Sequence, residues 1–421
     1  MSEAPGTTAT PEKPDGAAPE VKEPTGSRII REMLSSSVAV TVGAIVLAIL
    51  VGAILIVAAD PAVQEAAGYF FARPGDFFSA AWNAASSAYI ALFQGAIYDT
   101  QADTFSRGIR SLTESLTIAT PLIFAGLGVA LGFRAGLFNI GAQGQIIGGA
   151  ILGTYLGFTL NLPAGLHTLL ALLGALVGGG IMGAIPGFLK ARFGAHEVIV
   201  TIMLNNIMAF GVLWVVTTSV FASSTPLVSQ HIAPEAELGL MFGSGFRLHW
   251  GFVLALLAAA VVWWVLERSV FGFRLRAVGS NPHAAATAGM NVRTITVLAL
   301  VFSGALAGLA GAMQVQGTEG ALTASIAGTI GFDAITVALL GRSKPLGTVL
   351  AGILFGALAA GGRLMQTRTG TPIDLVPVLQ SLIVLFIAAP PLVRAVFRLP
   401  TPGQKRKPRK ARSAQSQEVA A

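Results

Sequence analysis

The 421-residue chain has no cysteine and few charged side chains. Without cysteine it forms no disulfide, no thiolate metal site and no iron–sulfur cluster, and no palmitoyl group can be attached through a thiol. Its five histidines lack the spacing of a metal-binding helix, so no metal site is predicted. Charged residues make up only 11% of the chain, whereas a soluble domain carries about a quarter. Because 53% of the residues are hydrophobic, the composition indicates an integral membrane protein.

Sequence motifs for ATP hydrolysis and for nucleophilic catalysis are also absent. The phosphate-binding loop of an ATPase needs a glycine–lysine pair, and this chain contains none. It has no G-x-S-x-G nucleophile motif, and Ser303 and Ser381 are isolated serines of the kind that pack between helices. The chain is therefore predicted to be no enzyme and to need no cofactor. Any transport through it would be driven by an ion gradient or by an ATP-hydrolysing partner chain.

Ten apolar stretches have lengths suited to membrane-spanning helices, which need about 20 residues. They are 38–59, 114–132, 137–160, 166–186, 197–220, 250–267, 294–316, 323–341, 346–361 and 373–391. The sequence thus predicts an all-α polytopic membrane protein with about ten transmembrane helices. It divides into a disordered tail at 1–37, a transmembrane domain at 38–392 and a basic tail at 393–421.

The distribution of positive charge predicts the orientation of these spans. If both termini are cytoplasmic, 21 of the 27 lysines and arginines fall in cytoplasmic segments. The outer segment 60–112 contains an aromatic stretch, 77–98, which we interpret as an amphipathic helix on the membrane surface, with an eleventh span as the alternative. The cluster "KRKPRK" at 405–410 is predicted to contact anionic lipid rather than nucleic acid.

Several amide side chains lie within the predicted spans, where a polar group is costly unless it has a partner or lines an aqueous path. Asn139 and Gln143 in "FRAGLFNIGAQGQIIGGA" (133–150) are four residues apart, so they are expected to share a helix face. They either line the path of a neutral, hydroxyl-rich solute or bridge helices. The other residues predicted to line the path are Asn205, Asn206, Gln314, Gln316 and Asp333. Glu114, Glu197 and Glu267 lie at span ends and are interpreted as interfacial charges.

Three segments carry a resemblance to a known family. The loop "GFRLRAVGSNPHAAATAGMNV" and the following "FSGALAGLAGA" resemble the coupling loop and next helix of bacterial ABC-importer permeases for branched-chain amino acids, simple sugars and nucleosides. "LFNIGAQGQIIGGA" resembles another element of that branch, with Gln143 where an acid usually stands, and "GFDAITVALLGRSKPLG" resembles a third. The last two indicate the simple-sugar and nucleoside subgroup. The resemblance covers about residues 110–392.

The resemblance implies a set of partners and an architecture. An ATPase subunit would dock on the cytoplasmic loop 268–293, a second and different permease chain would complete the path, and a substrate-binding lipoprotein or protein would dock outside. Spans 2–5 and 7–10 would form inverted halves in a bacterial cytoplasmic membrane. The residues expected to contact the ATPase are Arg274, Arg276, Gly279, Asn281, Ala285 and Gly289.

The sequence thus predicts the permease subunit of an ATP-driven importer for a nucleoside or a related simple sugar. The alternative is a transporter that works alone and is coupled to an ion gradient. In that case Asp333, the acid that lies deepest in the predicted spans, would be the proton or ion site.

Overall fold

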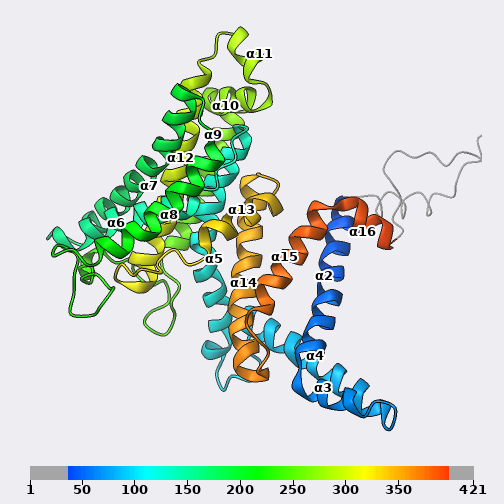
Figure 1. Cartoon of the computed structure of the whole chain (residues 1–421). Helices are drawn as coiled ribbons and strands as arrows, with labels where there is room; N and C mark the ends of the chain where they lie inside the picture. Colours follow the sequence, from blue (N-terminus) through cyan, green and yellow to red (C-terminus); the bar gives the residue numbers. More distant parts are fainter. Residues whose placement is uncertain (1–36, 398–421) are drawn as a thin grey trace, which may run out of the picture. The chain divides into compact units, whose positions relative to one another are not determined.

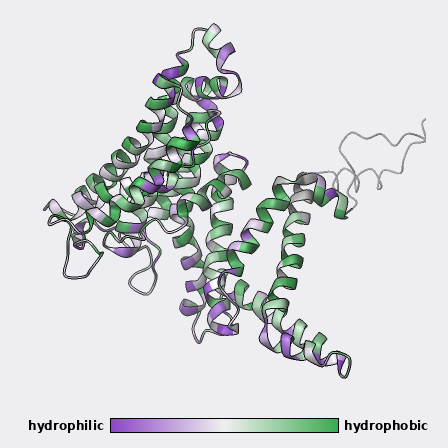
Figure 2. Cartoon of the chain, viewed as in Figure 1, coloured by the Kyte–Doolittle hydropathy of each residue, from purple (hydrophilic) through white to green (hydrophobic). Residues whose placement is uncertain are grey.

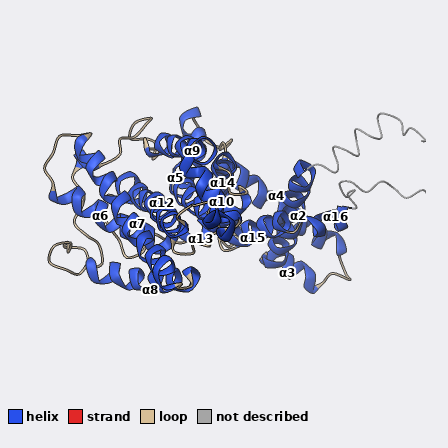
Figure 3. Cartoon of the chain, turned by 90° about the horizontal axis from the view of Figure 1, so that it is seen from above, coloured by secondary structure: helices blue, strands red, loops and turns tan. Residues whose placement is uncertain are grey.

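The computed structural model describes residues 37–397. The predicted tail at 1–37, apart from its last residue, lies outside this range, as do residues 398–421 of the predicted basic tail with the "KRKPRK" cluster. In the described part of the chain the regular structure is helical, and only isolated β-bridges join its loops (Figures 1 and 3). The prediction of an all-α fold is confirmed.

The helices follow the hydrophobic stretches of the sequence, with additional short helices between them. In chain order they are α2 (Ser37–Ala59), α3 (Pro61–Gly68), α4 (Pro74–Ala96), α5 (Phe105–Arg134), α6 (Ala142–Thr159), α7 (Leu166–Phe193), α8 (Glu197–Val215), the 3-10 helix η1 (Pro234–Ala236), α9 (Gly251–Arg268), α10 (Val270–Ser280), α11 (Pro282–Thr287), α12 (Val292–Gln314), the π-helix η2 (Val315–Glu319), α13 (Ile330–Leu340), α14 (Pro345–Thr369), α15 (Leu375–Ala388) and α16 (Pro390–Phe397).

The described residues fall into two compact units. The smaller one contains residues 37–44 of α2 together with α16, and in it Gly43 lies against Val393. The larger one, residues 45–389, contains the rest of α2 and all the other helices, and the candidate site described below belongs to it. Along its long helices hydrophobic residues predominate, whereas α10 and α11 carry many hydrophilic ones (Figure 2).

Seven of the described helices are long and apolar enough to span a membrane: α2, α5, α7, α8, α9, α12 with η2, and α14. This confirms a polytopic membrane protein. The other three predicted spans correspond to α6, α13 and α15, which are shorter or less apolar. The total of ten, the orientation and the inverted halves therefore stay predictions.

The eighth predicted span, 323–341, contains a much shorter helix than expected. Its helix α13 has 11 residues, which is about 16 Å and half of the hydrocarbon thickness. The preceding residues 320–329 are irregular, and Gly320 and Gly328 adopt the left-handed conformation there. Irregular backbone at membrane depth is tolerated where it is buried in protein or lines a cavity. Before this irregular segment, residues 315–319 form the π-helix η2, a form that often marks functional sites.

Glycines bring α7 and α12 into close contact. Gly179 and Gly183 on α7 face Gly304 and Gly308 on α12, each pair spaced by four residues. A β-carbon at Gly304 would lie 2.3 Å from the carbonyl oxygen of Gly179. Membrane helices associate mainly through van der Waals packing, and small residues let their backbones approach. These glycines therefore hold the centre of the fold together.

Helix α5 connects this group of helices to α14. It is 30 residues long and is buried over most of its length, and Figure 1 shows it between α12 and α14. On the α14 side, Gly356 faces the carbonyl oxygen of Ser115. Pro121 lies inside the helix, where it removes one backbone hydrogen bond. Because α5 starts nine residues before the predicted span, it also carries polar residues from the outer segment.

The aromatic stretch 77–98 forms most of α4, which is not among the helices apolar enough to span a membrane. The end of α4 packs against neighbouring helices. Gly95 lies against Gly361 of α14, and Ser115 Oγ of α5 donates a hydrogen bond to the carbonyl oxygen of Ala96 (2.6 Å). The surface position of this helix stays a prediction.

Candidate functional site

A cavity of about 440 Å³ opens between α5, η2, α13, α14 and α15, within the size range of small-molecule sites. It lies beside the half of α5 that is distant from α10, since α10 contacts the other end of α5 at Arg134. The polar lining residues are Glu114, Thr117, Arg247, Gln314, Thr318, Glu319, Thr329, Asp333, Arg363, Asp374 and Gln380. The apolar and glycine lining residues are Ile118, Pro121, Leu122, Gly328, Ile330, Phe355, Ala359, Ile373, Val376 and Pro377.

Two of the lining residues form an ion pair. Arg247, in the loop before α9, places Nη1 3.5 Å from Oε1 of Glu114 on α5. The other carboxylate oxygen of Glu114, Oε2, is buried and has no hydrogen-bond partner among the described residues. The pair ties the loop to α5 and leaves one acceptor oxygen unused in the wall.

The amino-terminal end of α13 forms another part of the lining. Gly328, Thr329 and Asp333 all border the cavity, and Thr329 Oγ1 donates a hydrogen bond to Asp333 Oδ2 (2.7 Å). A helix amino terminus carries a partial positive charge, which favours a carboxylate in the first turn. Asp333, predicted to line the path, is thus placed at this cavity.

Gln143 joins α6 to the start of α13. Its Oε1 accepts a hydrogen bond from the Gly331 backbone N–H (2.9 Å), and its Nε2 donates to the Gly328 carbonyl oxygen (2.6 Å). Both ends of the amide are therefore occupied by backbone groups. Gln143 is not a lining residue, but it fixes the helix end that carries Asp333.

Asn139 bridges three segments. Its Nδ2 donates to Gln145 Oε1 (2.9 Å) and to Ser303 Oγ (2.8 Å), and its Oδ1 accepts from the Gly141 N–H (2.9 Å). Its side chain is buried, away from the cavity lining. The expected shared helix face of Asn139 and Gln143 is wrong, because α6 begins only at Ala142 and the helical spacing does not apply to Asn139.

The two asparagines of α8 have different surroundings. Asn205 is buried and bridges to the start of α6, accepting from the Gly144 N–H (2.8 Å) and donating to the Ile140 carbonyl oxygen (2.9 Å). Asn206 is exposed and donates only to the carbonyl oxygen of Ile202 in its own helix (3.0 Å). Neither residue lines the cavity.

The two glutamines at the end of α12 and the start of η2 also have different surroundings. Gln314 lines the cavity and donates to the Ile326 carbonyl oxygen (3.5 Å). Gln316, which is 3% exposed, is no lining residue, and its side-chain polar atoms have no partner among the described residues. Beside it, the ring of His249 packs on Gly317. Burial, and to a smaller extent the charge of Arg247, lowers the pKa of His249 to about 4, so this ring is neutral at physiological pH.

Sequence reasoning missed most of the charged cavity residues. Glu114 was assigned to a span end, but α5 starts at Phe105, so Glu114 lies in its third turn. Thr104 caps the helix by accepting a hydrogen bond from the Arg107 N–H (3.4 Å), and a threonine before a helical run is a sequence signal that could have located this start. Arg247, Arg363 and Asp374 gave no comparable signal.

The cytoplasmic loop predicted at 268–293 folds into α10 and α11. Ser269 caps α10 by accepting from the Gly272 N–H (3.0 Å). Asn281 caps α11 by accepting from the N–H groups of His283 and Ala284 (both 3.0 Å). Asn281, expected to contact the ATPase, thus has a structural role in shaping the loop.

Three of the residues expected to contact the ATPase face the rest of this chain instead. Ala285 is buried in the hydrophobic core, and Gly279 packs against the backbone of Arg134. Arg276 turns back onto α9. Gly289 and Arg274 are exposed, as an ATPase contact requires. A six-residue helix is too short for its pattern of small residues to reveal the buried side.

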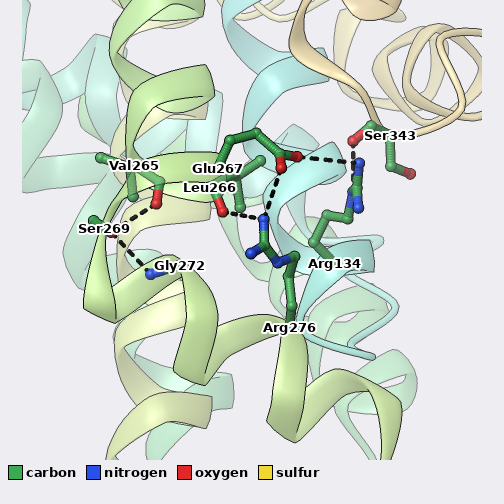
Figure 4. A network of polar contacts seen from close by, with 8 residues as sticks. All are labelled: Arg134, Val265, Leu266, Glu267, Ser269, Gly272, Arg276 and Ser343. Atoms are coloured by element: carbon green, nitrogen blue, oxygen red, sulfur yellow. Dashed lines mark hydrogen bonds and ion pairs between the residues drawn. The ribbon is translucent and has the colours of Figure 1, made fainter.

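Arg276 belongs to a charged network at the base of α10 (Figure 4). It donates to the Leu266 carbonyl oxygen and forms an ion pair with Glu267 Oε2 (3.0 Å). Arg134 at the end of α5 lies 4.0 Å from the other Glu267 oxygen and donates to the Ser343 carbonyl oxygen (3.0 Å). Ser343 has a left-handed backbone, in the turn between α13 and α14. The network therefore connects α10 with α5 and with the turn that follows α13.

A model of the family described as "Branched-chain amino acid transport system / permease component" matches residues 111–388. The chain belongs to this permease family. The match confirms the resemblance seen in the three sequence segments. It includes every residue that lines the cavity, as well as α10 and α11. Helices α2, α3 and α4 of the permease lie outside it.

Similar proteins have been named for nucleosides and for a sugar. The permease is 38% identical over 292 residues to the guanosine ABC transporter permease protein NupP of Bacillus subtilis, covering 68% of this chain and 82% of NupP. It is 34% identical over 289 residues to the glucose ABC transporter permease protein TsgB13 of Haloferax volcanii, covering 66% and 75%. It is 32% identical over 293 residues to the nucleoside ABC transporter permease protein NupB of Lactococcus lactis, covering 66% and 79%. No solved structure matches the chain.

Proposed function

We propose that this permease forms the translocation path of an ATP-driven importer for a nucleoside or a related simple sugar. The observation that carries the proposal is the cavity of about 440 Å³, lined by carboxylates, amides and hydroxyls within a polytopic membrane protein. The names of the relatives support it, since they specify guanosine, nucleosides and glucose.

The chemistry of the cavity suits such a solute. Hydroxyl groups of a sugar ring both donate and accept hydrogen bonds, and the amides of Gln314 and Gln380 offer both functions. Asp333 and Glu114 accept hydrogen bonds from hydroxyl or amino groups. The apolar side of the wall, which includes Phe355, is suited to the face of a base or a sugar. In this account Gln314 and Asp333 contact the solute, and Asn139, Gln143, Asn205 and Gln316 hold the helices around it.

The proposed importer includes partner chains. An ATPase would dock on the exposed residues of α10 and α11, a substrate-binding protein would deliver the solute on the opposite side, and a second permease chain would complete the path. The exposed Asn206 supports a polar surface next to α8, because an amide facing lipid is costly. The network from Arg276 through Glu267 and Arg134 to Ser343 would carry a movement of α10 to α13. The membrane would be a bacterial cytoplasmic membrane.

The rival function is ion-coupled transport by this chain alone, with Asp333 as the coupling site. Membership in a permease family of ABC transporters does not favour it. Asp333→Asn separates the two functions. It would abolish dependence on an ion gradient in the rival case, whereas an ATP-driven importer has no such dependence to lose.

The proposed solute can be tested by a substrate screen. The permease, assembled with an ATPase, a second permease and a binding protein from the same organism, is reconstituted and assayed with nucleosides, pentoses, hexoses and branched-chain amino acids. We expect uptake of nucleosides or simple sugars and none of branched-chain amino acids. Uptake of branched-chain amino acids alone would contradict the proposal.

A further inference from the structure

Helix α4 and its C-cap residue carry a row of exposed, large apolar side chains, here called the α4 stripe. Its members are Phe78, Trp82, Ile90, Phe93 and Ile97, each between 55% and 74% exposed. Successive members are three, four or eight residues apart, so they lie along one side of the helix. Because a contiguous apolar surface of this kind is unfavourable in water, it marks a site that another molecule covers.

The other sides of α4 have different surroundings. Ala88 and Leu92 belong to a buried hydrophobic cluster that also contains Ile56 of α2. Asn83 and Ser87 are exposed, and the helical spacing places them between the buried side and the α4 stripe. The helix therefore has a buried side, a polar edge and an apolar stripe. This is the pattern of a helix at the boundary of a membrane, with its apolar face among the lipid chains.

Contacts with α2 place the middle of α4 at membrane depth. Tyr89 Oη donates a hydrogen bond to the carbonyl oxygen of Ile49 (2.6 Å), and a β-carbon at Gly52 would lie 2.7 Å from the same hydroxyl. Helix α2 is long and apolar enough to span a membrane. Ile49 and Gly52 lie ten and seven residues before its end at Ala59, which corresponds to about 10–15 Å along the helix. The part of α4 around Tyr89 therefore lies beside a segment that lipid surrounds.

Aromatic rings gather at the amino-terminal end of the α4 stripe. Phe70, in the turn between α3 and α4, contacts Phe71, Phe77 and Phe78 edge to face, with ring centroids 5.3–6.1 Å apart. Phe71 is 99% exposed. Aromatic rings are enriched where a membrane meets water, whereas aliphatic side chains prevail deeper. The stripe has its rings at this turn and its isoleucines beside α2, so its composition also fits a surface covered by lipid.

The aliphatic end of the α4 stripe is hollowed into a groove of about 530 Å³, here called the α4 groove. Its apolar wall consists of Ile90, Phe93 and Ile97 with the rings of Tyr89 and Tyr98. A long, apolar wall of this kind is complementary to a hydrocarbon chain.

Polar groups of the α4 groove are supplied by Ser86, Gln94 and Thr100. Gln94 Nε2 donates a hydrogen bond to Thr100 Oγ1 (2.7 Å), and Gln94 Oε1 accepts one from Arg368 Nη1 (2.5 Å). The Thr100 hydroxyl accepts in this contact, so its own hydrogen can be donated to an ester or phosphate oxygen. The groove thus combines an apolar wall with a hydrogen-bond donor, as an amphipathic ligand requires.

From the apolar stripe, its depth beside α2 and the groove, we propose that the α4 groove binds an acyl chain of a bilayer phospholipid. The chain packs on Ile90, Phe93 and Ile97, and the ester region of the lipid lies at Thr100. The bound lipid stabilises α4 in its position against α2. This inference is independent of the proposed function, because the groove lies before the residues matched by the permease family and shares no lining residue with the cavity.

Photo-crosslinking tests the proposal. The full-length permease is reconstituted into phosphatidylcholine vesicles that contain a small fraction of phosphatidylcholine with a diazirine in one acyl chain. A second sample contains the importer assembled with an ATPase, a second permease and a binding protein from the same organism. After irradiation, the labelled residues are mapped by mass spectrometry. We expect residues 86–100 to be labelled more strongly than the exposed apolar residues of α9, such as Leu257 and Val261, in both samples.

Two matched variants test whether the groove itself holds the lipid. Ile90→Trp fills the groove, and labelling of residues 86–100 should fall about tenfold, because the chain loses contacts equivalent to those of one buried aliphatic side chain. Leu257→Trp adds the same ring to α9, at a residue with the same exposed fraction of 56%, and should leave that labelling unchanged. If Ile90→Trp does not fold, Ile97→Trp fills the groove from its other isoleucine and is read in the same way.

Three results would overturn the proposal. Residues 86–100 could be labelled no more strongly than α9, or the groove-filling variant could keep the full labelling. Alternatively, labelling could occur in the permease alone and disappear on assembly, which would show that a partner chain occupies the groove. Because transport is not measured, each of these results leaves the proposed function untouched.

Discussion

Replacing Gly308 by alanine is expected to prevent the permease from accumulating in folded form. A β-carbon at this position would lie 2.2 Å from the carbonyl oxygen of Ala175 and 2.9 Å from the Cα of Gly179. Both atoms belong to the backbone of α7, so no flexible side chain can move aside. Helices α7 and α12 would have to separate along their contact, which should cost at least about 3 kcal/mol.

A matched control is Gly211→Ala. Gly211 lies in α8, and a β-carbon there would meet no atom within 4 Å. Both variants add one methyl group to a glycine in a membrane helix, so a difference between them measures close packing alone. The measurement is the amount and the unfolding temperature of monodisperse protein after extraction in detergent. Equal values for the two variants would contradict the packing described for α7 and α12.

The second large effect is expected at the exposed side of α11. Ala286 is exposed there, so Ala286→Trp adds a bulky side chain without disturbing the core. If α11 docks on the ATPase, the added side chain should clash with that contact, through which ATP-driven movement reaches the permease. Transport should then fall at least about tenfold, while assembly in the membrane stays normal. The positions suggested by the sequence are unsuitable. Ala285 is buried, and Gly289 has a backbone φ of +80° that a side chain would strain.

The control for this experiment is Ala67→Trp, on an exposed position of the short helix α3. Uptake and ATP hydrolysis stimulated by the loaded binding protein are measured for both variants. Normal transport by Ala286→Trp would exclude α11 from the ATPase contact. Equal losses in the two variants would show that the added tryptophan acts through a general defect.

Most helices could be predicted from hydrophobic length, and the errors have local causes. Span 346–361 was too short, because α14 continues to Thr369 through Arg363 and Arg368. Arg368 pairs with Asp99 (2.7 Å), so its charge is tolerated beyond the apolar stretch. Conversely, span 323–341 was too long, because small apolar residues before α13 give a high hydropathy without forming a helix.

The site was less predictable than the fold. Asp333 and Gln314 stand out as polar residues in apolar stretches, and both are placed at the cavity. Gln143 stands out equally, but its partner Gly331 is 188 positions away in the chain, so its bridging role cannot be inferred from local sequence. Glu114 is interpreted from the sequence as an interfacial charge, because a charge at a span end is common.

The central claim is that this permease is driven by an ATP-hydrolysing partner. The most direct measurement is uptake of the solute found in the substrate screen into vesicles that contain the purified permease, with and without an ATPase, a second permease and a binding protein, at fixed ion gradients. The account predicts uptake only when all partners and internal ATP are present, and no change when the proton and sodium gradients are collapsed. Uptake by the permease alone that depends on an ion gradient would contradict it.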